Sequence, residues 1–331
     1  MSEPMPVPPS LPGDFEDIAR TQQTVQDELL SMPHVVGVAL GQKLVGGQVT
    51  SDRAIVVLVE DKVDEATLPA TQLVPPSIGG IPTDVQAVGK LRAGPQPLVT
   101  VQAVALTRRM RPVRGGISVG HHAITAGTIA TGCYDATASP GIPSRFYLLS
   151  NNHVLANSNV AAVGDAILQP GAYDGGTVQA DTIGHLSRFV TIQFTDGSAS
   201  PPVNEVDAAI AEVDLVDLDR HIHWVGNLRG IVPTPAVGLS LCKCGRTTGF
   251  TTGQIVNINA TVDVTYGDGK VARFIGQLVT SVMSAPGDSG SLVADLFGNA
   301  VGLLFAGSSR ATIVNPITAV QRLLGVKVVD G

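Results

Sequence analysis

Short apolar runs recur along most of the chain, and glycine, proline and polar residues separate them. A first set occupies residues 125–130, 145–149, 166–169, 183–186 and 208–213. A second set occupies residues 239–243, 253–258, 262–265, 274–279, 291–294, 301–305 and 312–314. Runs of this length that are rich in valine, isoleucine and threonine are typical of strands. The pattern therefore predicts a mainly β protein, and dense, evenly spaced strands favour a barrel or sandwich.

The first third of the chain has a different pattern. Residues 2–12 are rich in proline, and Asp14 can cap a helix whose apolar face runs from Phe15 to Leu29, before Pro33. Strands are expected at residues 35–40, 54–59, 85–88 and 98–106, with a proline-rich structured loop at residues 68–82. Since no group of residues here suggests chemistry, we expect residues 1–107 to form a small α+β domain with a packing or regulatory role.

A short basic stretch, residues 108–116, ends in two glycines and separates the two patterns. We interpret it as a solvated linker. The alternative is a processing site that frees Ile117, because exposed linkers are where proteolysis concentrates. Cleavage after Arg114 would leave Gly115 first, two residues out of register with that alternative.

Composition excludes several classes of partner and site. The 331 residues carry a net charge of −7 with only short basic clusters, which argues against nucleic acid and membrane partners. The N-terminus has acid and proline where a signal peptide needs a basic start, and no apolar run approaches the roughly 18 residues of a membrane span. The three cysteines are an odd count, so a reducing, cytoplasmic location is expected.

The candidate chemistry centres on residues 285–291, with the sequence Ala-Pro-Gly-Asp-Ser-Gly-Ser. Glycine neighbours can expose the Ser289 hydroxyl, and the backbone N–H groups of Gly287 and Ser289 can converge on one oxyanion. A serine hydroxyl is a weak nucleophile without a base and a group that orients the base. His153 and Asp207, each beside an apolar run, are the candidates. Taken alone, the Ser289 motif could be an ordinary turn, His153 a core histidine and Asp207 a cap. The order His, Asp, Ser, however, is a known order of a catalytic triad.

With these residues the chain resembles the trypsin-like, chymotrypsin-fold serine proteases, over roughly residues 113–325. Within that family it is more loosely similar to intracellular bacterial trypsin-like proteins and to the plant Narrow Leaf proteases. Three further segments carry the resemblance: residues 245–253, 302–307 and 313–324. The resemblance implies two six-stranded Greek-key β-barrels in residues 117–331, the first at about 117–225 and the second at about 226–331, with the site in the cleft between them.

The resemblance also implies a serine endopeptidase that acts on a protein or peptide through an acyl-enzyme. His153 would be the general base, Asp207 its orienting partner and Ser289 the nucleophile, with Gly287 and Ser289 as oxyanion donors. Asp288 would be structural, because a buried carboxylate needs a cationic partner. Lys243 or Arg246 is the expected cation, and the amine of a processed Ile117 is the weaker candidate.

Substrate-binding residues follow from the same resemblance. Met283 would form the floor of the specificity pocket and select a medium-sized apolar side chain. Phe305, Ala306 and Gly307 would offer a strand edge to an extended peptide. Many relatives have serine at the position of Phe305, which leaves Asp207 with one hydrogen-bond partner fewer.

Other functions stay open at this point. The chain could be a catalytically idle or self-processing module that binds partners, or an esterase with the same triad. The Narrow Leaf likeness favours a homo-oligomer. Residues His221, His223, Cys242 and Cys244 could supply zinc ligands, but the Cys-x-Cys and His-x-His spacings are looser than the two-residue spacings usual in zinc sites. We therefore expect neither a metal nor a cofactor.

Overall fold

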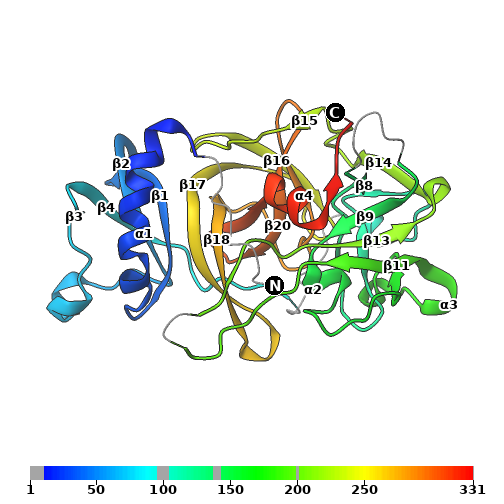
Figure 1. The fold of residues 1–331 in the computed structure, drawn as a ribbon, viewed down its shortest axis with the longest axis horizontal. Helices are drawn as coiled ribbons and strands as arrows, with labels where there is room; N and C mark the ends of the chain where they lie inside the picture. The colour runs from blue at the N-terminus through cyan, green and yellow to red at the C-terminus, as the bar shows by residue number, and fades with distance from the viewer. Residues whose placement is uncertain (1–10, 95–103, 137–142, 199–200, 331) are drawn as a thin grey trace.

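The computed structural model describes residues 11–94, 104–136, 143–198 and 201–330, and most of its strands form two large sheets (Figure 1). The first sheet has eight strands in the order β22-β8-β9-β13-β11-β10-β6-β7. These are β6 (Ser118–His121), β7 (Gly127–Thr128), β8 (Gly132–Asp135), β9 (Phe146–Ser150), β10 (Ala166–Leu168), β11 (Thr182–Phe189), β13 (Ala209–Val213) and β22 (Val326–Lys327). Buried residues such as Ile129, Leu149 and Ile210 fill the interior of this barrel.

The second barrel lies in the larger, twelve-stranded sheet. Its strands are β16 (Ser240–Gly245), β17 (Gly249–Thr265), β18 (Val271–Thr280), β19 (Leu292–Asp295), β20 (Asn299–Gly307) and β21 (Thr312–Pro316), with β12 (Val203–Asn204) and β15 (Gly230–Ile231) at its margins. The expected mainly β architecture with two barrels is confirmed. Two strands expected at residues 253–258 and 262–265 are one strand, β17, whose register is irregular around Asn259, a residue with φ of 50°.

The N-terminal elements join the second barrel directly. They are η1 (Gly13–Phe15), α1 (Glu16–Leu30), β1 (Val35–Val45), β2 (Gln48–Val59), η2 (Glu65–Thr67), η3 (Ala70–Gln72), β3 (Ser77–Ile78) and β4 (Ile81–Ala87). Strand β1 pairs antiparallel with β17, with Gly37 opposite Val262, so β1 to β4 extend the barrel sheet. Helix α1 packs on β1, and Gln22 Nε2 donates to the Val38 carbonyl at 3.0 Å. The domain boundary expected after residue 107 stays a prediction.

One local prediction in this region is wrong, and a second lies mostly outside the described residues. Asp14 lies in the η1 turn and α1 begins after Phe15, so Asp14 does not cap that helix. The strand expected at 98–106 falls largely outside the described residues, and Val104–Thr107 is a 3-10 helix, η4.

The expected linker is anchored in the structure. Its residues Val113–Gly115 form β5, which pairs with β14 (Leu218–Ile222), and Arg114 forms an ion pair with Asp219 at 2.9 Å. Ile117, which follows it, is fully buried in the first barrel. The second half of residues 108–116 is therefore a strand, and the expectation of a solvated hinge is wrong there.

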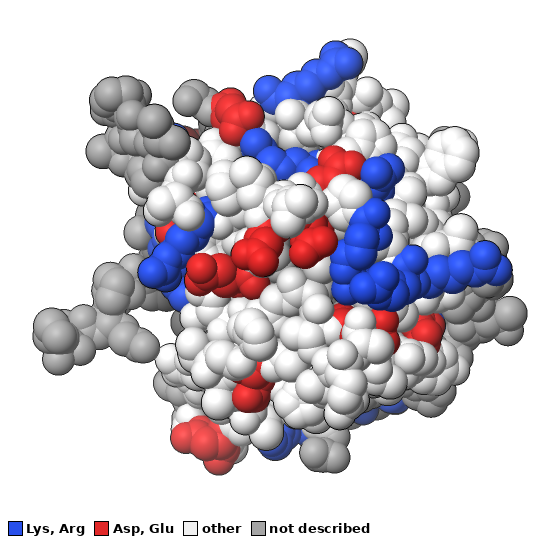
Figure 2. Space-filling model, turned by 90° about the vertical axis from the view of Figure 1, so that its right-hand side faces the viewer, with Lys and Arg blue, Asp and Glu red and all other residues white. Residues whose placement is uncertain are grey.

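The remaining elements are short, except for α4 (Ile317–Leu324), which packs against β20 and β21. They are α2 (Asn152–Leu155), α3 (Val178–Asp181), η5 (Ala172–Asp174), η6 (Leu215–Asp217) and η7 (Gly267–Gly269). No helix in the described ranges is long and apolar enough to cross a membrane. Figure 2 faces the end of the molecule on the right of Figure 1, where acidic and basic side chains both occur among uncharged surface.

Candidate active site

His153 and Asp207 lie side by side because their strands are neighbours. Strand β9 ends three residues before His153, which lies in α2, and β13 begins two residues after Asp207. Since β9 and β13 pair antiparallel, the end of one strand meets the start of the other. His153 Nδ1 lies 2.6 Å from Asp207 Oδ2, and the His153 backbone N–H donates to Asp207 Oδ1 at 3.1 Å. Asp207 is fully buried, so its carboxylate fixes the orientation of the imidazole.

A third side chain, Tyr266, completes the surroundings of the carboxylate. The Tyr266 hydroxyl donates to Asp207 Oδ2 at 2.7 Å, from the residue that follows β17. Two amides hold the Asp207 backbone, since Asn315 Oδ1 accepts from its N–H at 3.1 Å and Asn151 Nδ2 donates to its carbonyl at 2.7 Å. Phe305 was expected to leave Asp207 with one hydrogen-bond partner fewer, and this expectation is wrong because Tyr266, the residue after β17, supplies a hydrogen bond to Asp207.

Sequence reasoning missed Tyr266. The only local signal is a polar aromatic residue at the end of an apolar run, directly before Gly-Asp-Gly. Nothing in the linear sequence relates it to Asp207, 59 residues upstream. Strand β12 ends three residues before Asp207 and pairs with β18, and β18 pairs with the end of β17, directly before Tyr266.

We expect Tyr266 to make the protein less stable at high pH. Burial is the main cause that raises the pKa of the Tyr266 hydroxyl well above its ordinary value of 10.0, and the negative charge of Asp207 is the second cause. Above about pH 10 the unfolded chain loses this proton and the folded chain keeps it, so the free energy of unfolding falls as pH rises. Across pH 10 to 11 this contribution approaches about 1.4 kcal/mol per pH unit.

Chemical denaturation at pH 9 to 11 measures this effect, as the difference between the wild-type chain and Tyr266→Phe. Tyr173→Phe is the matched control, because Tyr173 is 58% exposed. The control should keep the alkaline slope of the wild-type chain. Equal slopes in wild type and Tyr266→Phe would contradict the prediction.

Residues 285–291 form a loop in which the backbone N–H groups of Gly287 and Ser289 are free to bind an anion. The Pro286 carbonyl accepts from Thr247 Oγ1 at 2.8 Å, and the Asp288 carbonyl accepts from the Ser291 N–H at 3.0 Å. In a trans peptide the N–H points opposite to the carbonyl, so the N–H groups of Gly287 and Ser289 point out of the loop. No acceptor among the described residues takes either one. Gly287 has a φ of 99°, a conformation that favours glycine.

The same loop is fixed against the barrel that carries His153. The Ser289 carbonyl accepts from the Thr128 N–H at 2.8 Å. A Cβ on Gly290 would lie 2.1 Å from the hydroxyl oxygen of Ser150, the last residue of β9, so only glycine fits there. Within the described chain, His153 Nε2 is buried without a hydrogen-bond partner, and no hydrogen bond joins it to the Ser289 hydroxyl. The structure thus brings Ser289 to the end of β9, where α2 begins.

Asp288 and Lys243 form a buried ion pair behind the loop. Lys243 Nζ lies 3.1 Å from Asp288 Oδ2, and both side chains are fully buried. The carboxylate also accepts from Thr248 Oγ1 at 2.6 Å and from three backbone N–H groups, those of Thr247, Thr248 and Ala285. Burial lowers the pKa of Lys243, and the charge of Asp288 offsets part of this. Of the two expected cations, Lys243 is the one that contacts Asp288.

Arg246 binds a different carboxylate. Its Nε donates to Asp174 Oδ2 at 2.9 Å, and its Nη2 donates to the other oxygen of Asp174. The Arg246 backbone N–H donates to Thr128 Oγ1 at 3.0 Å, so Arg246 links the second barrel to the first. The expectation that Arg246 is a partner of Asp288 is wrong, and its role is to hold the two barrels together beside the loop.

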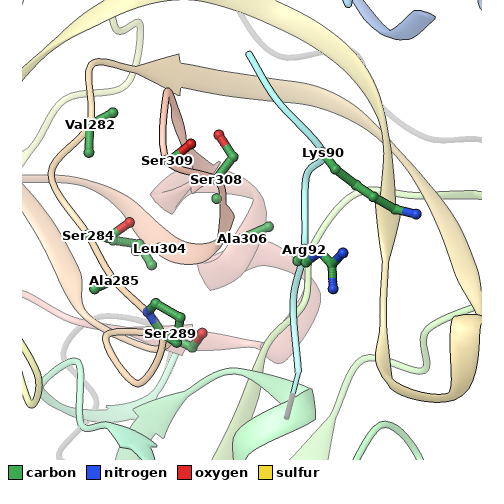
Figure 3. Close-up of a pocket in the computed structure, with 12 residues that line it drawn as sticks. Lys90, Arg92, Val282, Ser284, Ala285, Ser289, Leu304, Ala306, Ser308 and Ser309 are labelled. Atoms are coloured by element: carbon green, nitrogen blue, oxygen red, sulfur yellow. The ribbon is translucent and has the colours of Figure 1, made fainter. Parts of the chain in front are cut away.

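A cavity of about 470 Å³ opens beside Ser289. Ser284, Ala285 and Ser289 line one side, with Ala306 across from them (Figure 3), and Gly307 also lines the cavity. Met283 is not among the lining residues. Met283 is only 3% exposed, and its sulfur packs against Gly253 so closely that a Cβ on this glycine would lie 2.9 Å from it. Met283 is therefore not the floor of this cavity.

Phe305 does not line the cavity either. Its fully buried ring packs on Phe274, with ring centroids 4.7 Å apart. Ala306 and Gly307 are thus the part of the expected substrate edge that faces the cavity. On the opposite side from Ser289 the lining includes Lys90 and Arg92, which the sequence did not mark (Figure 3).

The described residues include no group of three or more histidine, cysteine or acidic side chains that could hold a metal. All three cysteines are buried and free. Burial raises the pKa of Cys133 to about 12 and that of Cys244 to about 11, so both are thiols at neutral pH.

No family model and no curated protein sequence matches this chain. Among solved structures it is similar to Thermobifida fusca Protease A, with 17% identity over 66% of this chain and 99% of that chain and a TM-score of 0.46. It is also similar to Cellulomonas bogoriensis chymotrypsin, with 18% identity over 66% and 99% of the two chains and a TM-score of 0.43. A Nocardiopsis protease matches with 18% identity over 65% and 97%, at a TM-score of 0.45. In its fold, this chain is similar to the chymotrypsin-fold serine proteases.

Proposed function

We propose that this chain is a serine endopeptidase that cleaves peptide bonds through an acyl-enzyme on Ser289. The observation that carries the proposal is the arrangement at residue 153. Asp207 binds Nδ1 of the buried His153 imidazole. The other ring nitrogen, Nε2, has no partner among the described residues. It lies at the end of the first barrel that holds the Ser289 loop. A general base needs this combination of a fixed tautomer and a free nitrogen.

In this mechanism His153 Nε2 takes the proton of Ser289 as Oγ attacks the substrate carbonyl. Asp207 and Tyr266 keep the imidazole in place, and the carboxylate stabilises the cation that forms. The outward N–H groups of Gly287 and Ser289 receive the oxyanion, and one such donor contributes about 3 kcal/mol to the transition state. His153 then protonates the leaving amine, and water repeats the cycle on the acyl-enzyme. The hydrogen bond between a nucleophile and its general base, here Ser289 Oγ and His153 Nε2, tightens when the substrate binds.

A fluorophosphonate probe tests the proposal directly. We expect one adduct, located at Ser289 by peptide mapping, because only an activated serine reacts at a useful rate. His153→Ala should react at least about 100-fold more slowly, which is the contribution of a general base. A chain that stays unmodified would show an idle module, and an adduct at another serine would contradict the assignment of Ser289 as the nucleophile. Hydrolysis of small esters with no cleavage of a peptide library would favour the esterase alternative.

A further inference from the structure

The strand edge expected to bind a substrate is already occupied by a segment of this chain. Arg92 and Gly307 exchange two backbone hydrogen bonds, with Arg92 N–H donating to the Gly307 carbonyl at 3.0 Å and Gly307 N–H donating to the Arg92 carbonyl at 3.1 Å. The pairing is antiparallel. It uses both main-chain groups of Gly307, which are the groups that an extended peptide would need at this edge.

On its other side the segment pairs with the end of β17. The Thr265 N–H donates to the Leu91 carbonyl at 3.0 Å, and the Ala93 N–H donates to the Thr265 carbonyl at 3.0 Å. Residues 90–94, which we call the internal strand, therefore lie between β20 and β17. Figure 3 shows the part that carries Lys90 and Arg92 running past Ala306 and Ser308, across the cavity from Ser289.

Side chains of the internal strand alternate between core and cavity, as the two-residue period of a strand requires. Leu91 and Ala93 are 1% and 2% exposed, in a core cluster that includes Tyr266 and Phe305. Lys90 and Arg92 are exposed and line the cavity. The strand is thus held by two apolar side chains and four backbone hydrogen bonds, a set that another extended peptide can reproduce.

The internal strand also has the direction that a substrate needs. From Arg92, opposite Gly307, it runs to Gly94, where a Cβ would lie 3.6 Å from the Tyr266 ring. The Tyr266 hydroxyl binds Asp207, so the chain runs from N- to C-terminus toward the triad. A peptide that presents a carbonyl to Ser289 must place the residues before that carbonyl along this edge in the same direction.

We propose that the internal strand occupies the position in which the residues on the acyl side of an extended peptide substrate bind, so that a substrate must displace residues 90–94. The proposal rests on the proposed peptidase function and names the form of its substrate, an extended strand with apolar side chains at alternate positions. An attached segment competes at an effective concentration in the millimolar range. A free peptide at micromolar concentration therefore finds the edge occupied in most molecules.

A binding measurement tests this independently of catalysis. The probe is a fluorescent peptide with the sequence of residues 88–94, Val-Gly-Lys-Leu-Arg-Ala-Gly, and the protein is the full chain with Ser289→Ala. Arg92→Pro removes the N–H that donates to Gly307, and Leu91→Ala weakens the apolar contact while the backbone is kept. We expect both to bind the probe at least about tenfold more tightly than the parent chain, because apparent affinity rises with the fraction of open edges.

Ile55→Ala is the matched control, because Ile55 is also fully buried but lies in β2, outside the internal strand. It should bind the probe as weakly as the parent chain. Equal affinity in Leu91→Ala, Ile55→Ala and the parent would overturn the proposal, as would no binding by any variant. Leu91→Ala keeps the test decisive if Arg92→Pro does not fold. Fluorophosphonate labelling of Ser289 in the wild-type chain separately reports whether the peptidase proposal fails.

Discussion

Replacement of Ser289 by alanine is expected to lower kcat for peptide cleavage at least about a thousandfold, with the fold unchanged. The side chain is half-buried at the cavity, and no described hydrogen bond uses its hydroxyl, so the loss of one oxygen leaves the packing intact. Without the nucleophile no acyl-enzyme forms, and the residual rate comes from the oxyanion donors and binding alone. Steady-state cleavage of a peptide library measures the change.

The control is Ser187→Ala, in β11 of the first barrel and outside the site, which should keep the activity of the unaltered chain. His153→Ala combined with Ser289→Ala should lose little more than Ser289→Ala alone, because residues that act as a unit are not additive. Full activity in the Ser289→Ala chain would remove this serine from the mechanism.

Replacement of Lys243 by methionine is expected to lower the free energy of unfolding by about 3–5 kcal/mol. Methionine fills a similar volume, but the change leaves the fully buried Asp288 carboxylate without its cation. The neutral donors around Asp288 then carry the whole charge, and the loop with Gly287 and Ser289 loses its support. Denaturant unfolding measures the stability, and fluorophosphonate labelling of Ser289 should slow in parallel.

A double variant separates the buried charge from simple loss of packing. Lys243→Met with Asp288→Asn should regain part of the stability, because no uncompensated charge remains. Arg145→Met is the surface control, since Arg145 and Glu212 form a pair at 3.7 Å with side chains 62% and 47% exposed, worth less than about 1 kcal/mol. A loss below about 1 kcal/mol in Lys243→Met would refute the prediction.

The parts of the site that could be predicted from sequence are those with a local signature. Ser289 and its glycines form a compact motif, and His153 and Asp207 each sit next to a recognisable buried strand. Antiparallel pairing of β9 with β13 then places the last two in contact. The buried cation beside Asp288 was predictable as a chemical need, although the choice between Lys243 and Arg246 was not. That choice depends on Asp174, a carboxylate far away in the sequence.

The residues that sequence missed depend on long-range packing. Tyr266 follows β17, and the pairing of β18 with both β17 and β12 places it beside Asp207. Met283 turns into the core because Gly253 leaves room for its sulfur. Residues 90–94 carry no motif at all, and only the pairing of Arg92 with Gly307 reveals their place. The cytoplasmic location and the homo-oligomer stay predictions.

The pairing of β1 with β17 has a practical consequence for work with this protein. A shortened chain that begins at Ile117 would leave one side of the long strand β17 uncovered, with its amides unpaired and with Ile258 and Val262, now fully or almost fully buried, open to solvent. Uncovered strand borders of this kind recruit other chains into aggregates. Recombinant preparation therefore favours residues 1–331 together over residues 117–331 alone.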